Sequence, residues 1–213
     1  MKRVLAIALA AALLCGVLLM LSACDVSVDD TMLFAGMRWL VLDEQDGYAL
    51  LLSEEIIAID VYHGEFENST WEHSDIRHWL NQELYYRFSE QDRARIRQTH
   101  VTNNDNPWFG TPGGNNTVDN IFLLSLEEVE QYFGNNGLRY GPPEPGVERR
   151  YTRDRPIEVQ IAYFIDRAES WWLRSPGVNE SAAALVLNTG CLSVSGNSFP
   201  AEIGIRPALW LYL

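Results

Sequence analysis

The stretch SWWLRSPG, residues 170–177, places two tryptophans at adjacent positions, directly before an arginine and a Pro-Gly chain breaker. Successive side chains of a strand point to opposite faces, so Trp171 shares one face with Leu173 and Trp172 the other with Arg174. Because large aromatic side chains are rarely left exposed, we expect both tryptophans to lie in the core of a sheet that is covered on both sides. The alternative stacks Trp172 on the Arg174 guanidinium as part of a ligand-recognition surface.

A second arginine, Arg206, precedes the closing segment PALWLYL. A planar guanidinium with five donors can tie loop carbonyls or a carboxylate together, so we expect structural roles for Arg174 and Arg206, as for Trp171. The apolar segment after Pro207 predicts a terminal strand, which must be paired to be stable. We expect its partner to be the first strand, residues 37–43, and Pro207, which cannot donate to a ladder, to mark a bulge or an edge.

The remaining pattern indicates a single α+β domain. Two apolar runs around residues 44–47 predict a β-hairpin with a four-residue loop. Ser74, Ser89 and Ser125 each precede a short amphipathic segment, which predicts three capped helices too short to be stable unless they pack on a sheet. Residues 157–165, 169–174, 182–187 and 191–195 show strand-like patterns.

Two long segments without periodicity lie between these elements, at residues 103–120 and after the third helix. Long loops in a compact domain are usually functional or disordered. Trp108 and Phe109 stand in the first loop, in the sequence DNPWFGT, and combine flat apolar area with neighbouring amide groups. They are therefore our candidates for contacting a sugar or a peptide, and the alternative is that they fix the loop to the core.

The N-terminus indicates an extracytoplasmic protein. Lys2 and Arg3 precede an apolar run and the sequence LSAC, which ends at Cys24. This order is typical of a secretory signal peptide over residues 1–23, and it resembles a bacterial lipobox in which Cys24 is lipidated. An uncleaved membrane anchor is the alternative. We therefore expect a membrane-anchored chain with a polar leader at 24–36 and one domain at 37–213.

Charge and cysteine content exclude several classes. Removing Lys2 and Arg3 from the 16 basic residues leaves 14 arginines against 29 acidic residues, a net charge of −15. Such a balance argues against nucleic acid or an anionic lipid surface as partner. Cys191 is then the only cysteine besides Cys24, so we expect no disulfide framework, and a lone Cys191 is expected to be a small buried hydrophobic residue.

Metal and catalytic signatures are sparse. Asp105, Asn115, Asn116 and Asp119 offer oxygen ligands for calcium, but they lack EF-hand spacing, and such clusters are ordinary turn formers. Beyond this calcium alternative we expect no cofactor. The four histidines show neither an i, i+4 pair nor an HExxH motif, and we expect His73 and His78 on different faces of a helix, which makes a zinc site improbable.

The motifs WWLRSPG (171–177) and GIRPALWL (204–211) resemble an uncharacterised bacterial family known only as a domain of unknown function. The resemblance extends to ALLLSEEII, STWEHSDIRHWLN, NPWFGT and DNIFLLSLEEVEQYF. More distantly, that family is similar to the C-type-lectin-like and sulfatase-modifying-factor fold, which implies paired terminal strands, two helices and long loops. The calcium-binding triplets of sugar-binding lectins are missing here, where EPG (144–146) is nearest, and so is the cysteine pair of the sulfatase-modifying enzymes.

These observations predict a lipid-anchored lipoprotein whose domain binds a carbohydrate or peptide without catalysis. The candidate ligand contacts are Trp108, Phe109, Trp172 and Arg174. Two alternatives remain: a cell-wall or glycan hydrolase that uses a carboxylate pair, and a scaffold for a protein partner.

Overall fold

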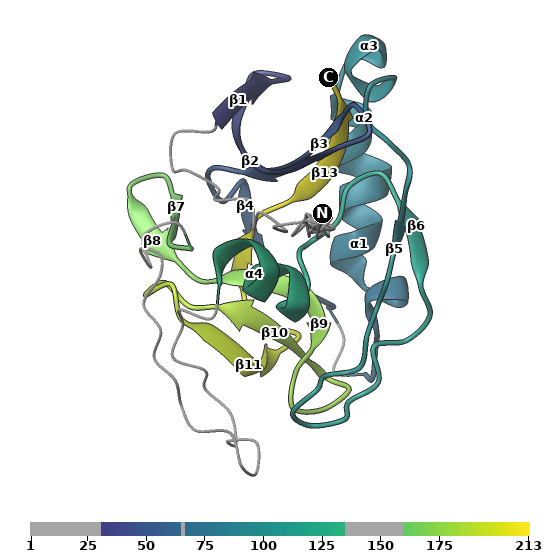
Figure 1. Ribbon diagram of the computed structural model, residues 1–213. Coiled ribbons are helices and arrows are strands. Elements are labelled where there is room, and N and C mark those ends of the chain that lie inside the picture. The colour runs from purple at the N-terminus through teal and green to yellow at the C-terminus, as the bar shows by residue number, and fades with distance from the viewer. Residues whose placement is uncertain (1–30, 65–66, 135–159) are drawn as a thin grey trace, which may run out of the picture.

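The computed structural model describes residues 31–64, 67–134 and 160–213. In this part the chain forms two main sheets, two small two-stranded ribbons and short helices (Figure 1). Nearly all strand pairs are antiparallel, which confirms the α+β class expected from the sequence. The strands are β1 Thr31–Phe34, β2 Met37–Gln45, β3 Tyr48–Ser53, β4 Ala58–Asp60, β5 Thr99–Val101, β6 Thr117–Asp119, β7 Ala162–Phe164, β8 Arg167–Glu169, β9 Trp171–Pro176, β10 Ala182–Val186, β11 Leu192–Ser198, β12 Ile203–Ile205 and β13 Ala208–Tyr212.

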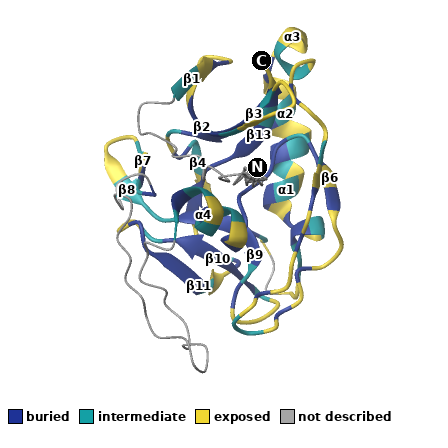
Figure 2. Cartoon of the chain, viewed as in Figure 1, coloured by how far each residue is buried: buried dark blue, intermediate teal, exposed yellow. Residues whose placement is uncertain are grey.

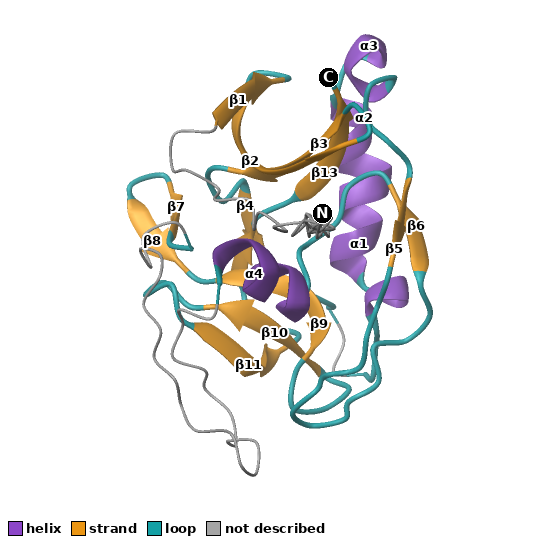
Figure 3. Cartoon of the chain, viewed as in Figure 1, coloured by secondary structure: helices purple, strands orange, loops and turns teal. Residues whose placement is uncertain are grey.

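The helices form one long segment and two separate short helices (Figure 3). The long segment contains the 3-10 turn η1 Trp71–His73, α1 Asp75–Trp79, the π turn η2 Leu80–Leu84 and α2 Tyr85–Arg87, and α3 Glu90–Arg93 and α4 Leu126–Phe133 follow. All three predicted serine caps are present. Ser74, Ser89 and Ser125 accept hydrogen bonds from the backbone N–H of Arg77, Asp92 and Glu128, and Ser125 completes the expected capping box with Glu128.

The first sheet has the order β1-β2-β3-β13. Its β2–β3 hairpin lies where the sequence predicts one, but the loop is only Asp46 and Gly47, with φ of 54° and 79°. Two positive φ angles are characteristic of a tight type I′ turn, which suits an Asp-Gly pair. The loop is therefore two residues long instead of the expected four, and the first strand of the hairpin extends to Gln45.

The terminal strand does not pair with the first predicted strand. β13 pairs with β3, from Ala208 opposite Leu52 to Tyr212 opposite Tyr48, so β3 separates it from β2. The chain enters and leaves the domain through one sheet, but its ends are not adjacent strands. The expected pairing was wrong because the alternation of apolar and polar residues identifies strands, but it does not show which of the two strands of a hairpin pairs with a third strand.

The domain also begins earlier than residue 37. Thr31–Phe34 form β1, which pairs with β2 from Thr31 opposite Leu40 to Phe34 opposite Met37. Phe34 is buried against Trp39 and Phe88. The last residues assigned to the polar leader therefore belong to the first sheet.

The second sheet has the order β11-β10-β9-β12-β4, which places β9 at its centre. Its WW pair is buried on both faces: Trp171 and Trp172 are each 0% exposed, and Figure 2 shows β9 and β10 in dark blue. The chain then passes from β12 of this sheet to β13 of the first sheet at Arg206 and Pro207. Pro207 thus occupies the break between two strands, where no ladder needs its missing N–H.

Candidate functional site

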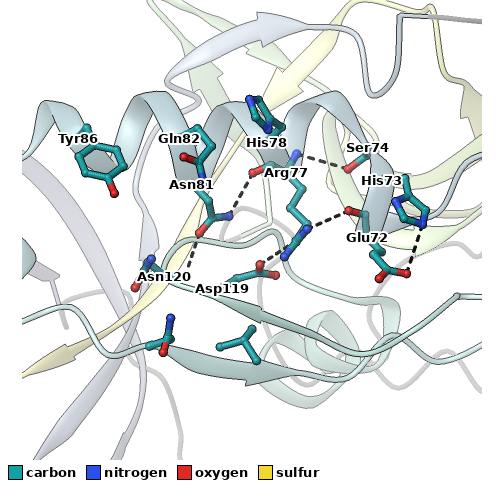
Figure 4. Close-up of a pocket in the computed structure, with 12 residues that line it drawn as sticks. Glu72, His73, Ser74, Arg77, His78, Asn81, Gln82, Tyr86, Asp119 and Asn120 are labelled. Carbon is teal, nitrogen blue, oxygen red and sulfur yellow. Dashed lines mark hydrogen bonds and ion pairs between the residues drawn. The ribbon is translucent and has the colours of Figure 1, made fainter.

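A polar groove of about 430 Å³ lies between the long helical segment and the β5–β6 ribbon. Small-ligand sites have volumes of this order. Its described lining comprises Glu72, His73, Ser74, Arg77, His78, Asn81, Gln82, Tyr86, Gln98, Val118, Asp119 and Asn120. Figure 4 shows Arg77 and Asn81 reaching from the helix toward Asp119 and Asn120, with Tyr86 at the opposite end of the helix from Glu72 and His73.

The floor of the groove is built on Asp119, a carboxylate that is 1% exposed at the end of β6. Its oxygens accept hydrogen bonds from Trp71 Nε1 at 2.9 Å, Arg77 Nε at 2.7 Å and Thr117 Oγ1 at 2.7 Å. Arg77 also donates from Nη1 to the carbonyl of Glu72 at 2.8 Å. Since a buried charge is costly without partners, this network both neutralises the carboxylate and fixes the ribbon to the helix.

A π turn shapes the helical wall at this point. Asn81, in the η2 segment, accepts from the backbone N–H of Asn120 at 2.8 Å and of Ile121 at 3.2 Å, and donates to the carbonyl of Ile121 at 2.8 Å. The Asn81 amide therefore pairs with the backbone of residues 120–121 in the way that a neighbouring strand would. π turns are rare and are frequently found at functional sites.

The rim of the groove carries side chains that are not used by the fold. His78, Gln82 and Gln98 are exposed, and their side chains make no hydrogen bond to the described residues; the same holds for the side-chain amide of Asn120. Tyr86 is 60% exposed, and the Arg93 guanidinium lies 5.0 Å from its ring centroid. The rim thus offers amides, an imidazole and one aromatic face to a ligand.

The structure gives Trp172 and Arg174 structural roles. Trp172 donates from Nε1 to the carbonyl of Asp60 at 3.1 Å and packs edge-on against Tyr62. Arg174, 5% exposed, forms a two-pronged ion pair with Glu128 and donates to the carbonyl of Leu123 at 2.7 Å. The ligand-contacting alternative for Trp172 and Arg174 is therefore wrong, because β9 is an inner strand with both faces covered.

Trp171 and Arg206 lie together in the core. The Arg206 guanidinium lies 5.1 Å from the Trp171 ring centroid and donates to the carbonyls of Ser53 and Glu54 at 2.9 and 3.3 Å. Burial lowers the pKa of Arg206 to about 9, and the nearby charge of Glu54 opposes this shift, so the group is still charged at neutral pH. It fixes the crossover between the two sheets to the end of β3.

Trp108 and Phe109 do not line the groove. Both are half-buried and pack against the core. Their loop is anchored by the side chain of Asn106, which is 0% exposed; its Oδ1 accepts from the backbone N–H groups of Trp108 and Phe109 at 2.9 and 3.3 Å. Asn106 also donates to the carbonyl of Pro176 at 2.8 Å, which fixes this loop to the end of β9.

The four calcium candidates do not converge. Asp105 accepts from the backbone N–H of Gly113, Asn116 from that of Asn103, and Asn115 donates to Glu72. Asp119 lies in the groove network. In the part of the chain that the structure describes, no group of three or more His, Cys, Asp or Glu side chains is placed to hold a metal ion.

Other sequence expectations have mixed outcomes. Cys191 is buried, as expected of a small hydrophobic residue. His73 and His78 both line the groove, and His73 lies in η1, before α1 begins, so the two histidines do not belong to one α-helix. Cys24 and residues 1–23 lie outside the described residues. No helix within the described ranges is long and apolar enough to cross a membrane.

The groove has little signal in the amino-acid sequence. Its lining comes from residues 72–86, from Gln98 and from residues 118–120, which are brought together only by the fold. Asp119 was singled out for a different role, as a calcium ligand. The π turn has no sequence signature comparable to a cap, so Asn81 and Gln82 could not be assigned to a wall.

A protein-family model described as a domain of unknown function (DUF6273) matches residues 46–213. No curated protein and no solved structure matches the chain. The match covers both sheets from the β2–β3 turn onward and all the helices. The distant C-type-lectin-like similarity stays an expectation.

Proposed function

Since the chain belongs to the DUF6273 family of domains of unknown function, we propose from its own geometry that it is a lipid-anchored extracytoplasmic binding domain, and that the groove binds a neutral saccharide. The observation that carries this proposal is the set of unengaged side-chain amides along the groove rim. Gln82, Gln98 and Asn120 each present a donor and an acceptor to the same space.

Amides are suited to sugar hydroxyls because each hydroxyl both donates and accepts a hydrogen bond. The exposed ring of Tyr86 at one end of the groove supplies flat apolar area, which the C–H face of a pyranose can cover. A peptide backbone also matches amides, and it is the competing ligand that the experiment below includes.

The charges of the groove favour an uncharged ligand. The single arginine of the lining, Arg77, is bound to Asp119, and Glu72 accepts from Asn115 at 2.9 Å with His73 Nε2 3.4 Å away. Both carboxylates are therefore engaged in holding the walls. This engagement also makes the glycan-hydrolase alternative less favourable, because such an enzyme needs a free acid and a free base or nucleophile.

The anchor is proposed at Cys24, on the basis of the signal-peptide order and the lipobox that ends there. Replacing Cys24 by serine is expected to release the mature chain from the membrane fraction and to abolish incorporation of labelled palmitate. A Cys24→Ser chain that stays in the membrane would instead support the uncleaved anchor.

Saccharide binding is tested by thermal unfolding of the mature chain with neutral oligosaccharides, charged oligosaccharides and short peptides. A ligand at 100 times its Kd adds about 2.7 kcal/mol. For a domain of this size, that corresponds to about 5–10 °C in Tm. We expect the shift with neutral saccharides alone.

The variants Gln82→Ala and Tyr86→Ala should abolish this shift while leaving the ligand-free Tm nearly unchanged, since both side chains are exposed. Gln91→Ala is the matched control, because Gln91 is an exposed glutamine on α3 that is not among the lining residues. A shift that survives both groove variants would place the ligand elsewhere. A shift with peptides alone would replace the saccharide in this proposal.

A further inference from the structure

We propose that one edge of the domain, formed by β1 and the β7–β8 hairpin, rests on the lipid bilayer, with the side chains of Leu33 and Ile165 in the interface. This inference rests on the proposed lipid anchor, and it adds the orientation of the domain on the membrane. Leu33 and Ile165 are the two most exposed large apolar side chains in the described residues, at 74% and 76%.

These two side chains belong to one edge of the molecule. Leu33 pairs with Arg38, the carbonyl of Arg38 accepts from Glu54 N–H, and Ile56 N–H donates to the carbonyl of Tyr163 in β7. Figure 1 shows β1 and the β7–β8 hairpin along the same side of the molecule, and Figure 2 colours the hairpin tip as exposed. Tyr163 adds a further half-exposed aromatic ring, at 48%.

The hairpin tip retains an apolar residue where the backbone disfavours it. Ile165 is the first of two loop residues between β7 and β8 and has φ of 60°. A β-branched residue in the left-handed region is a true outlier, and glycine is the usual choice at such a turn position. An isoleucine that is both strained and exposed indicates a contact outside the domain rather than a need of the fold.

The length of the tether identifies the bilayer as that contact. Cys24 lies seven residues before Thr31, where β1 begins, so an extended chain spans at most about 25 Å. A domain of this size has a radius of gyration of about 16 Å, hence a diameter greater than the tether. The side that carries β1 therefore has to face the membrane.

The orientation also explains where the groove lies. Figure 1 shows α1 and the β5–β6 ribbon on the opposite side of the molecule from the β7–β8 hairpin. With β1 and the hairpin on the bilayer, the groove opens away from it, toward extracellular ligands. Because the mature chain is acidic, the contact depends on apolar side chains, and neutral phosphatidylcholine is the appropriate probe.

The experiment uses the mature chain, residues 24–213, with a hexahistidine tag before residue 24 and Cys24→Ser, held on phosphatidylcholine vesicles by a nickel-chelating lipid. This attachment fixes the N-terminus whether or not Cys24 is lipidated in cells, so the orientation is tested separately from the anchor. Single cysteines replace Leu33, Ile165 or Val118 and carry an environment-sensitive fluorophore, while Cys191 is buried and stays unlabelled. Nitroxide-labelled lipids then quench fluorophores that enter the interface.

We expect the labels at residues 33 and 165 to lose fluorescence and the label at residue 118 to keep it; Val118 is 43% exposed on β6, beside the groove. Equal quenching at all three positions would overturn the proposal. The variant Ile165→Gly tests the role of the tip, since glycine adopts this φ without strain. It should raise the Tm and reduce quenching at residue 33, whereas a lower Tm with unchanged quenching would assign Ile165 to the fold.

Discussion

Replacing Asn106 by aspartate is predicted to destabilise the domain strongly at neutral pH. The amide nitrogen of Asn106 donates to the carbonyls of Pro176 and Val194, each at 2.8 Å, and lies 3.3 Å from that of Gly177. Its oxygen accepts from the N–H groups of Trp108 and Phe109. An aspartate has the same shape but places a second oxygen against three carbonyls.

The magnitude follows from the charge. The buried carboxylate is repelled by these carbonyls, and this repulsion is relieved only when the carboxylate binds a proton in the folded state. Keeping a group with an ordinary pKa near 3.9 protonated at pH 7 costs about 4 kcal/mol. The lost hydrogen bond adds about 1 kcal/mol, which gives a total of about 5 kcal/mol. The free energy of unfolding of a native domain is only about 5–15 kcal/mol in total.

Urea unfolding of residues 24–213, followed by tryptophan fluorescence, measures this loss of stability. Since the folded protein holds the extra proton, the destabilisation should grow as the pH rises from about 4 and shrink again on return to acid. Asn197→Asp is the matched control: Asn197 is exposed, and its Oδ1 accepts from Ser198 N–H at 2.9 Å. That variant should stay within about 0.5 kcal/mol of wild type.

An Asn106→Asp protein that unfolds at the same urea concentration as wild type at pH 7 would refute this account of the loop anchor. A large loss of stability that does not diminish toward acid pH would refute the electrostatic part alone. In that case the cost would come from packing or from the lost donor.

Three further predictions concern the core. Burial raises the pKa of Tyr62 far above its ordinary value, so the stability of the fold should fall above about pH 10, where only the unfolded chain loses the proton. Tyr62→Phe should flatten this alkaline loss in urea titrations at several pH values, and near neutral pH it should cost about 1 kcal/mol for the lost hydrogen bond to the Arg174 carbonyl. Gly196→Ala should prevent folding, judged by circular dichroism, because a Cβ there would lie 1.9 Å from the carbonyl oxygen of Ala183; Gly110→Ala, with a similar φ and open space, should cost only about 1 kcal/mol. Arg174→Met should cost about 2–4 kcal/mol in urea, and an unchanged midpoint would show that its pairing with Glu128 contributes nothing net.

Local patterns in the sequence predicted much of the secondary structure. The caps at Ser74, Ser89 and Ser125 were predictable because each depends on a side chain and a backbone N–H three residues apart. The β2–β3 hairpin was predictable for the same reason, although its loop proved shorter. The burial of both tryptophans in SWWLRSPG also follows from their size.

Long-range neighbours were not predictable in this way. The partner of β13 was misassigned because alternation fixes which face a residue occupies and not which strand lies beside it. For Trp172 and Arg174 the sequence left a ligand contact open as an alternative, because the position of β9 inside its sheet is a long-range property.

The sequence by itself determined the short-range features: the α+β class, the helix caps and the acidic charge. Each depends on residue types within a few positions of one another. Only the tertiary structure decided the groove, because its walls are separated by some 40 residues in sequence, as between Arg77 and Asp119. It likewise decided that Leu33 and Ile165 share an edge, since exposure depends on what the rest of the chain leaves uncovered.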